Sequence, residues 1–112
     1  MRGLKLKNQR PEDKIKDNIR KMLVLKGWYV MMTHGNMFQS GFPDLYATHS
    51  KYGGRWIEIK LPGMVGSHFT TAQLEHFPKL CANGTGVWIL TSDNESEYEK
   101  LFQPYNWWSM ML

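Results

Sequence analysis

The chain has 112 residues, of which 42% are hydrophobic, 13% aromatic and 21% charged, and its formal net charge is +4. That length suits one domain with a modest core, and the composition is typical of a globular protein, which excludes a disordered chain. No run of apolar residues approaches the roughly 18 that a membrane span needs.

The first half of the chain predicts one helix followed by three strands. Pro11 and the two acids after it start a helix that runs to about Lys26, and Gly27 is placed to cap it. Hydrophobic and β-branched residues then recur in three short runs. The last two runs form a hairpin, because the loop SKYGG between them contains two glycines. The three strands expected are 28–33, 45–49 and 55–60.

The second half predicts a helix and a parallel strand. A glycine-spaced loop leads into a helix over 70–82, with Pro78 as the site of a kink, and VWILT (87–91) is a short apolar strand. A strand that returns through a helical crossover lies parallel to the strand before the helix. The order αβββαβ predicts an α/β fold, a mixed central sheet flanked by helices, and 92–102 adds a short helix.

Three charged residues of the hairpin fall on one face of the sheet. A five-residue loop after His49 places Asp44 opposite Lys60 and Tyr46 opposite Glu58. Asp44, Glu58 and Lys60 then share a face, and the two carboxylates lie close enough to bind one ion. A slip of one residue would send the charges of one strand to the other face. The face is therefore either a metal site or a solvated surface with an ordinary Asp–Lys pair.

Two polar residues on the helices lie toward this face. Glu12 falls on the helical stripe of Ile15 and Ile19, so its carboxylate points inward, although an acid at a helix start also interacts with the helix dipole. Gln73 follows Thr70 by three residues. That spacing fits a capping box, but Gln73 also lies on the apolar stripe of its helix. Capping and a role in a site both remain open for Gln73.

These residues carry a resemblance to a known family. The block GFPDL (41–45), the triplet Glu58-Ile59-Lys60, the earlier Glu12 and the TxxQ sequence at Thr70 together resemble the PD-(D/E)XK nuclease superfamily, in particular its VRR-NUC branch. More distantly, they are similar to the archaeal Holliday junction resolvases. The resemblance covers about 11–92 and implies a restriction-endonuclease-like core.

The resemblance also implies roles for the matching residues. Asp44 and Glu58 would bind a divalent metal together with the backbone carbonyl of Ile59, and Glu12 would bind it directly or through water. Lys60 would orient the attacking water, and Gln73 would support the site or contact the phosphate. The implied cofactor is Mg²⁺, with Mn²⁺ able to substitute and no small-molecule cofactor. Carboxylates suit this role, because both ions prefer hard oxygen ligands.

Contacts with DNA are expected from basic residues outside this block. The first ten residues contain four bases and no acid, which leaves ten of the 14 bases to balance the ten acids elsewhere. Such an arm either contacts phosphates or is a solvated tail. His34 opens the loop before GFPDL, and two further bases flank the hairpin. The candidate DNA-binding residues are Arg2, Lys5, Lys7, Arg10, His34, Lys51 and Arg55.

The expected organisation is a basic arm (1–10) followed by one nuclease domain (11–112), whose apolar extension (93–112) ends in WWSMML. This tail either completes the core or forms the interface of a homodimer. The N-terminus lacks the apolar core of a secretory signal, and the single cysteine, Cys81, excludes an internal disulfide and a CxxC zinc site. We therefore expect an intracellular, cytoplasmic protein that associates with the nucleoid and has no membrane partner.

Three functions are consistent with these features. The first is a metal-dependent DNA endonuclease that is specific for branched structures, as a junction resolvase is. The second is a free-standing, sequence-specific endonuclease of the homing type on the same fold, for which so small a chain offers little surface for base readout. The third is a DNA-binding module that has kept the fold but does not cleave.

Overall fold

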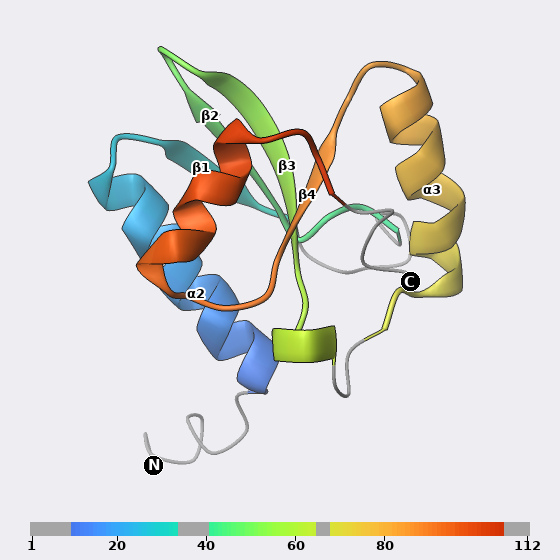
Figure 1. Cartoon of the computed structure of the whole chain (residues 1–112), viewed down its shortest axis with the longest axis horizontal. Coiled ribbons are helices and arrows are strands. Elements are labelled where there is room, and N and C mark those ends of the chain that lie inside the picture. Colours follow the sequence, from blue (N-terminus) through green and yellow to red (C-terminus); the bar gives the residue numbers. More distant parts are fainter. Residues whose placement is uncertain (1–9, 34–40, 65–67, 107–112) are drawn as a thin grey trace.

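The computed structural model describes residues 10–33, 41–64 and 68–106, which form a four-stranded sheet with helices on both faces (Figure 1). The strands are β1 (Tyr29–Met32), β2 (Leu45–His49), β3 (Gly53–Ile59) and β4 (Val87–Leu90). The helices are α2 (Pro11–Leu25), α3 (Thr71–Ala82) and two 3-10 helices, η1 (Pro62–Met64) and η2 (Glu95–Phe102). The order in the sheet is β1-β2-β3-β4, with β4 parallel to β3 and the other pairs antiparallel. The predicted mixed sheet and the parallel crossover are confirmed.

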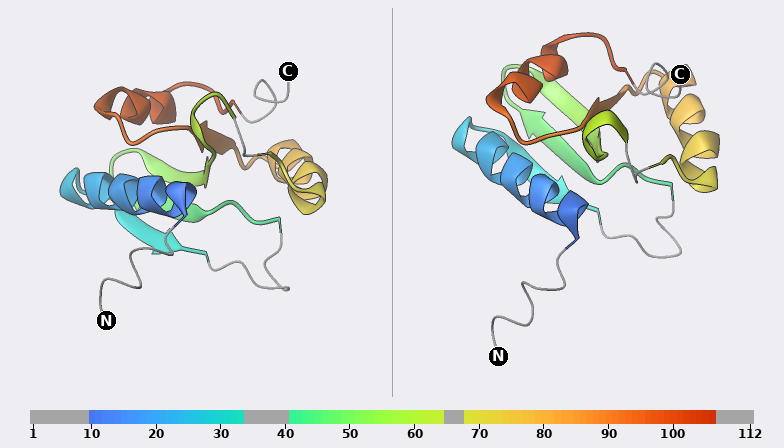
Figure 2. Two further views of the ribbon diagram at one scale, coloured as in Figure 1. Left: turned by 90° about the horizontal axis from the view of Figure 1, so that it is seen from below. Right: turned by 60° about the horizontal axis from the view of Figure 1, so that its bottom comes forward.

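The larger core lies between the sheet and the pair α2 and η2, which run side by side on the far side of the molecule from α3 (Figure 2). Ile19 and Leu23 of α2 are fully buried against Ile57 and Ile59 of β3. Leu101 of η2 is buried in the same cluster. The segment after β4 is thus packed into the core of the domain.

The smaller core lies under α3 on the opposite face of the sheet. Phe77 of α3 is fully buried against Val87 and Ile89 of β4, and Trp56 of β3 packs at the edge of this cluster. The alternation of side chains along β3 sends Ile57 and Ile59 to the larger core, whereas Trp56 and Glu58 face the α3 side. The charged face predicted for this strand is therefore the α3 face.

The predicted hairpin register is wrong by two residues. Tyr46 pairs with Trp56, where the five-residue loop had placed it opposite Glu58, and His49 pairs with Gly53. The turn is shorter than predicted because Gly53 adopts φ 87°, a left-handed conformation that lets β3 begin two residues earlier. A shift of two residues preserves the faces of a strand, so the shared face of the charged residues is unaffected. Continued by one step, the observed register puts Asp44 opposite Glu58 and not opposite Lys60.

The remaining elements follow the sequence closely. Gly27 has φ 94° directly after α2, as expected of a left-handed cap, and the segment predicted as a short helix forms the 3-10 helix η2. None of the described helices is long and apolar enough to span a membrane. The WWSMML tail, on which the homodimer prediction depends, lies outside the described residues.

Candidate active site

The block GFPDL reaches the sheet by passing closely under α3. Gly41 is buried with φ 90°, and a Cβ there would lie 2.5 Å from Cδ2 of His76 and 2.9 Å from the carbonyl oxygen of Ala72. Only glycine fits both the conformation and the contact. Pro43 is fully buried, and the N–H of Thr33 donates to the carbonyl of Asp44 over 2.9 Å. These contacts fix the backbone of Asp44 directly before the start of β2.

Asp44 and Glu58 each accept a hydrogen bond from the backbone of the other's strand. The N–H of Asp44 donates to Oε1 of Glu58 over 3.1 Å, and the N–H of Ile59 donates to Oδ2 of Asp44 over 2.8 Å. The β2–β3 pairing ends at Leu45 and Ile57. The two carboxylates therefore accept hydrogen bonds from backbone N–H groups that lie beyond the last pair of this ladder. This reciprocal arrangement holds the two acids side by side at the edge of the hairpin.

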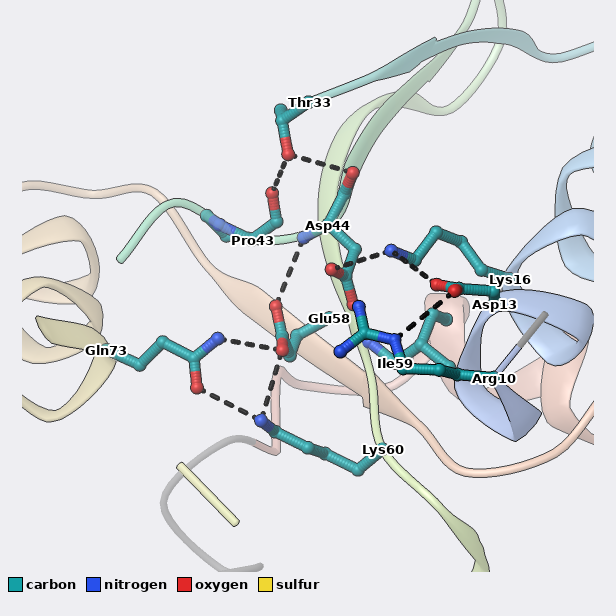
Figure 3. A network of polar contacts seen from close by, with 10 residues as sticks. All are labelled: Arg10, Asp13, Lys16, Thr33, Pro43, Asp44, Glu58, Ile59, Lys60 and Gln73. Atoms are coloured by element: carbon teal, nitrogen blue, oxygen red, sulfur yellow. Dashed lines mark hydrogen bonds and ion pairs between the residues drawn. The ribbon is translucent and has the colours of Figure 1, made fainter. Parts of the chain in front are cut away.

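Lys60 and Gln73 complete a buried polar cluster around Glu58. Nζ of Lys60 lies 3.2 Å from Oε2 of Glu58 and donates to Oε1 of Gln73 over 3.0 Å. Nε2 of Gln73 donates to the same Oε2 over 2.8 Å. The three side chains are at most 8% exposed, and Figure 3 shows them converging from β3 and α3. The sequence placed Glu58 and Lys60 on one face, and the contact with Gln73 is the arrangement that the family resemblance implied.

Gln73 also caps α3. Its backbone N–H donates to Oγ1 of Thr70, and its Oε1 accepts from the backbone N–H of Thr70, which is the reciprocal pattern of a capping box. The capping bond and the contact with the buried cluster therefore coexist, because Oε1 accepts from both Thr70 and Lys60. The start of α3 and the acidic cluster are joined through one amide.

The environment of Glu58 disfavours its charged form. Burial is the largest cause, followed by repulsion from the Asp44 carboxylate, and together they raise the pKa of Glu58 to about 8. Lys60 and Gln73 act in the opposite direction without offsetting these effects. Near pH 7 the carboxyl group of Glu58 is therefore mostly protonated in the metal-free protein, and a cation held between the two acids would favour its ionised form.

Lys16 of α2 is a site residue that the sequence analysis missed. Its Nζ lies 3.2 Å from Oδ1 of Asp44, and Figure 3 shows it on the side of Asp44 away from Gln73. Asp13 also pairs with Lys16, over 3.8 Å, and with Arg10, over 3.4 Å. Lys16 lies four residues after Glu12 and therefore on the same side of the helix, but this spacing does not identify Asp44 as its partner.

Glu12 is not gathered with the two acids as a third ligand. Among the described residues no group of three His, Cys, Asp or Glu side chains is placed to hold a metal ion. Glu12 is partly buried and lines a small hollow of about 170 Å³ with Pro11 and Leu61, the residue that follows Lys60. The water-mediated contact to the metal, one of the two modes that the family resemblance implied for Glu12, stays a prediction.

The predicted DNA-binding residues separate into three groups. Arg55 is engaged within the fold, since its Nε donates to the carbonyl of Leu101 over 2.8 Å and its guanidinium lies over the ring of Trp88. Lys51 at the hairpin turn and Arg10 before α2 are exposed. The other four candidates lie outside the described residues: Arg2, Lys5, Lys7 and His34.

A comparison with solved structures identifies a chain with the same fold. Its title is "VRR_NUC domain", and the match covers 84% of this chain and 97% of that one, with 18% sequence identity and a TM-score of 0.62. The fold is that of a VRR_NUC domain. No family model and no curated protein matches the sequence. The fold class predicted from the GFPDL and Glu58-Ile59-Lys60 residues is thus confirmed by the structure, although the sequence itself matches no family model.

Proposed function

We propose that this VRR_NUC-like domain is a metal-dependent DNA endonuclease, and that branched or partly unpaired DNA is its substrate. One observation carries the proposal: Asp44, Glu58 and Lys60 meet at one edge of the sheet, with each acid fixed by a backbone amide. Glu58 and Lys60 are buried, whereas charged pairs on a solvated surface are exposed. This burial argues against the alternative of a solvated surface with an ordinary Asp–Lys pair.

The two acids suit Mg²⁺, which commonly takes one or two carboxylates and completes its shell with waters and substrate phosphate. A third protein carboxylate is not needed for such a site. Asp44 and Glu58 would hold the ion, with the Ile59 carbonyl as a further ligand and Glu12 contacting it through water. When bound, the ion stabilises the charge that develops on the phosphate and lowers the pKa of water.

Lys60 supplies a fixed positive charge beside the phosphate. All three N–H bonds of its ammonium have acceptors nearby, because it contacts Glu58, Gln73 and the carbonyl of His68, the last over 2.7 Å. The His68 carbonyl belongs to the loop before α3, whereas the other two acceptors belong to the buried cluster. We infer that substrate takes the place of the His68 carbonyl, so that Lys60 orients the attacking water or a phosphate oxygen.

Arg55 bears on the choice between structure and sequence specificity. Reading a base sequence needs several side chains that reach base edges in the major groove. Arg55 bonds to Leu101 and Gly54 within the fold, which removes one of the few candidates. This favours recognition of DNA structure over recognition of a long sequence, and it places the homing-type function second.

A cleavage assay on four DNA substrates tests the proposal. A four-way junction, a flap, a linear duplex and a single strand are incubated with the native chain in Mg²⁺, in Mn²⁺ and in EDTA. We expect cleavage of the junction or the flap with either metal and none in EDTA. Cleavage of one linear sequence alone would establish the homing-type function, and salt-sensitive binding without any cleavage would establish the non-catalytic module.

Two variants and one control connect any cleavage to the site. Lys60→Met keeps the apolar stem and removes the ammonium, and Asp44→Asn removes one proposed metal ligand. Each should lower the cleavage rate by about 100-fold or more, as loss of a preorganised charge commonly does. Lys79→Met, at an exposed lysine of α3, controls for the loss of one positive charge. Full activity of both site variants, with native folding by circular dichroism, would place the chemistry elsewhere.

A further inference from the structure

An aromatic hollow adjoins the candidate active site on the α3 face of the sheet. It has a volume of about 380 Å³ and is lined mainly by apolar side chains from β1, β2, β3 and the GFPDL block. Three of these residues form a row of cross-strand neighbours, in which Met31 pairs with Tyr46 and Tyr46 pairs with Trp56. The full lining is Met31, Met32, Thr33, Phe42, Tyr46 and Trp56.

The helix on this face does not cover the hollow. In the described part of the chain α3 packs over β4 and the edge of β3, so Trp56 lies at the boundary of the covered half. Beyond it, Met31 is 51% exposed and Phe42 is 45% exposed. Exposed apolar side chains clustered in this way usually mark a contact surface.

The aromatic rings that line the hollow contact one another. The Tyr46 and Trp56 ring centroids are 4.9 Å apart, and the Phe42 ring meets Trp56 edge-on at 6.1 Å. The Tyr46 ring extends over Gly54, where any side chain would collide with its hydroxyl group. A glycine at 54 therefore lets the tyrosine lie along the sheet, where its ring and the inclined rings of Trp56 and Phe42 line the hollow.

The hollow and the acids share the same strands. Trp56 precedes Glu58 by two residues on one face of β3, a separation of about 7 Å, and Phe42 precedes Asp44 by two residues. If a DNA strand binds with one phosphate at Glu58 and Lys60, the base next to that phosphate lies within reach of these rings. Aromatic side chains beside a backbone-binding groove are the usual means of holding unpaired bases by stacking.

We propose that this hollow binds one unpaired nucleobase of the DNA strand whose phosphate lies at Glu58 and Lys60. The inference rests on the proposed endonuclease function and specifies its substrate: a phosphate next to a base that is free to leave its stack. Bases within an intact duplex are paired and stacked, so they cannot enter the hollow without being extruded. The preference for branched or flapped DNA follows from this requirement.

The test is a binding scan with abasic residues, carried out in Ca²⁺ so that no strand is cut. Fluorescence anisotropy measures the affinity for flap oligonucleotides in which a single abasic residue is moved along the strand, one position at a time. The native chain should lose roughly 5- to 100-fold in affinity at one position and little at the others. Phe42→Ala should bind the intact flap more weakly and lose most of that position dependence.

A matched control is Leu25→Ala, at an 88% exposed apolar residue on the opposite face of the sheet, which should respond as the native chain does. Urea unfolding verifies that Phe42→Ala is folded. An equal response of the native chain and Phe42→Ala at every abasic position would overturn the base site. Sedimentation tests a second outcome that would contradict the proposal. If the native chain is a dimer and the Met31→Asp variant is a monomer, this face is a protein interface and not a base site.

These outcomes are separable from failure of the proposed function. If the native chain cleaves flaps but shows no position dependence in the scan, the endonuclease stands and the base site is wrong. If the native chain neither binds nor cleaves DNA, both are wrong. A position-dependent loss that disappears in Phe42→Ala supports the base site even before cleavage is measured, because the scan reads affinity alone.

Discussion

Replacing Glu58 with glutamine should remove a large pH dependence from the stability of the metal-free protein. The pKa of Glu58 is raised from 4.5 to about 8 in the folded chain, first by burial and then by the Asp44 carboxylate. Below pH 4.5 the side chain is protonated in both the folded and the unfolded states. Between 4.5 and 8 the folded state keeps a proton that the unfolded state has lost, so the free energy of unfolding falls as the pH rises.

The expected size follows from the two pKa values. Each unit of difference is worth ~1.4 kcal/mol, and between pH 5 and pH 8.5 most of the interval from 4.5 to 8 is crossed. The loss of stability is therefore about 4 kcal/mol. A domain of this size is stable by roughly 5 to 15 kcal/mol, so the effect is readily measured.

Urea unfolding at a series of pH values in EDTA, followed by circular dichroism, measures this slope. Glu58→Gln should flatten this dependence of the unfolding free energy on pH. Asp44→Asn removes the carboxylate that repels ionised Glu58, so this variant should lose less stability by pH 8 than the native chain. Glu75→Gln, at an exposed acid of α3, controls for the loss of a carboxylate. Parallel curves for the native chain and Glu58→Gln would refute the reasoning, since they would mean that Lys60 and Gln73 keep Glu58 ionised throughout.

Three further predictions concern the metal and the loop. Binding of Mn²⁺ near pH 7 should release close to one proton from Glu58, measured by calorimetry in buffers of different ionisation enthalpy; no dependence on the buffer would contradict this. Lys16→Met should tighten Mn²⁺ binding several-fold, because the ion no longer displaces a lysine from its carboxylate ligand, whereas Lys21→Met should not change the affinity. Gly41→Ala should destabilise the fold by about 1 to 3 kcal/mol more than Gly84→Ala in thermal unfolding. Both glycines have φ 90°, but only the first has neighbours within 4 Å, so equal costs would refute the steric argument.

The sequence predicted most of the fold because its signals are local. Helix starts, glycine caps and short apolar runs each depend on a few adjacent residues, and Pro11, Gly27 and VWILT all lie where they were expected. The hairpin turn was misjudged because Gly53 shortens it. The predicted face of the site is still correct, because the register differs by an even number of residues, which keeps Glu58 on the same face as Trp56.

What the sequence could not supply were contacts between distant segments. Lys16 meets Asp44 across 28 positions of the chain, and nothing in the helical pattern of α2 names its partner. Trp56 had no assignable role from the sequence, since Tyr46 and Phe42 reach it from another strand and from the loop before it. Burial of Glu58 has the same origin, because Gln73 closes over it from α3.

The charges of the site are arranged in two opposed pairs that a cation must rearrange. Lys16 pairs with Asp44 from the α2 side, and Lys60 lies beside Oε2 of Glu58 on the α3 side. An ion between the acids would compete with Lys16 for Asp44, and it would take up the negative charge that Glu58 gains on losing its proton. Lys60 then depends less on Glu58 and more on its other acceptors, among which the His68 carbonyl is the one outside the buried cluster. Under the proposed function, metal binding and the release of Lys60 toward a phosphate would thus be coupled through Glu58, and Gln73 would carry the same coupling to the start of α3.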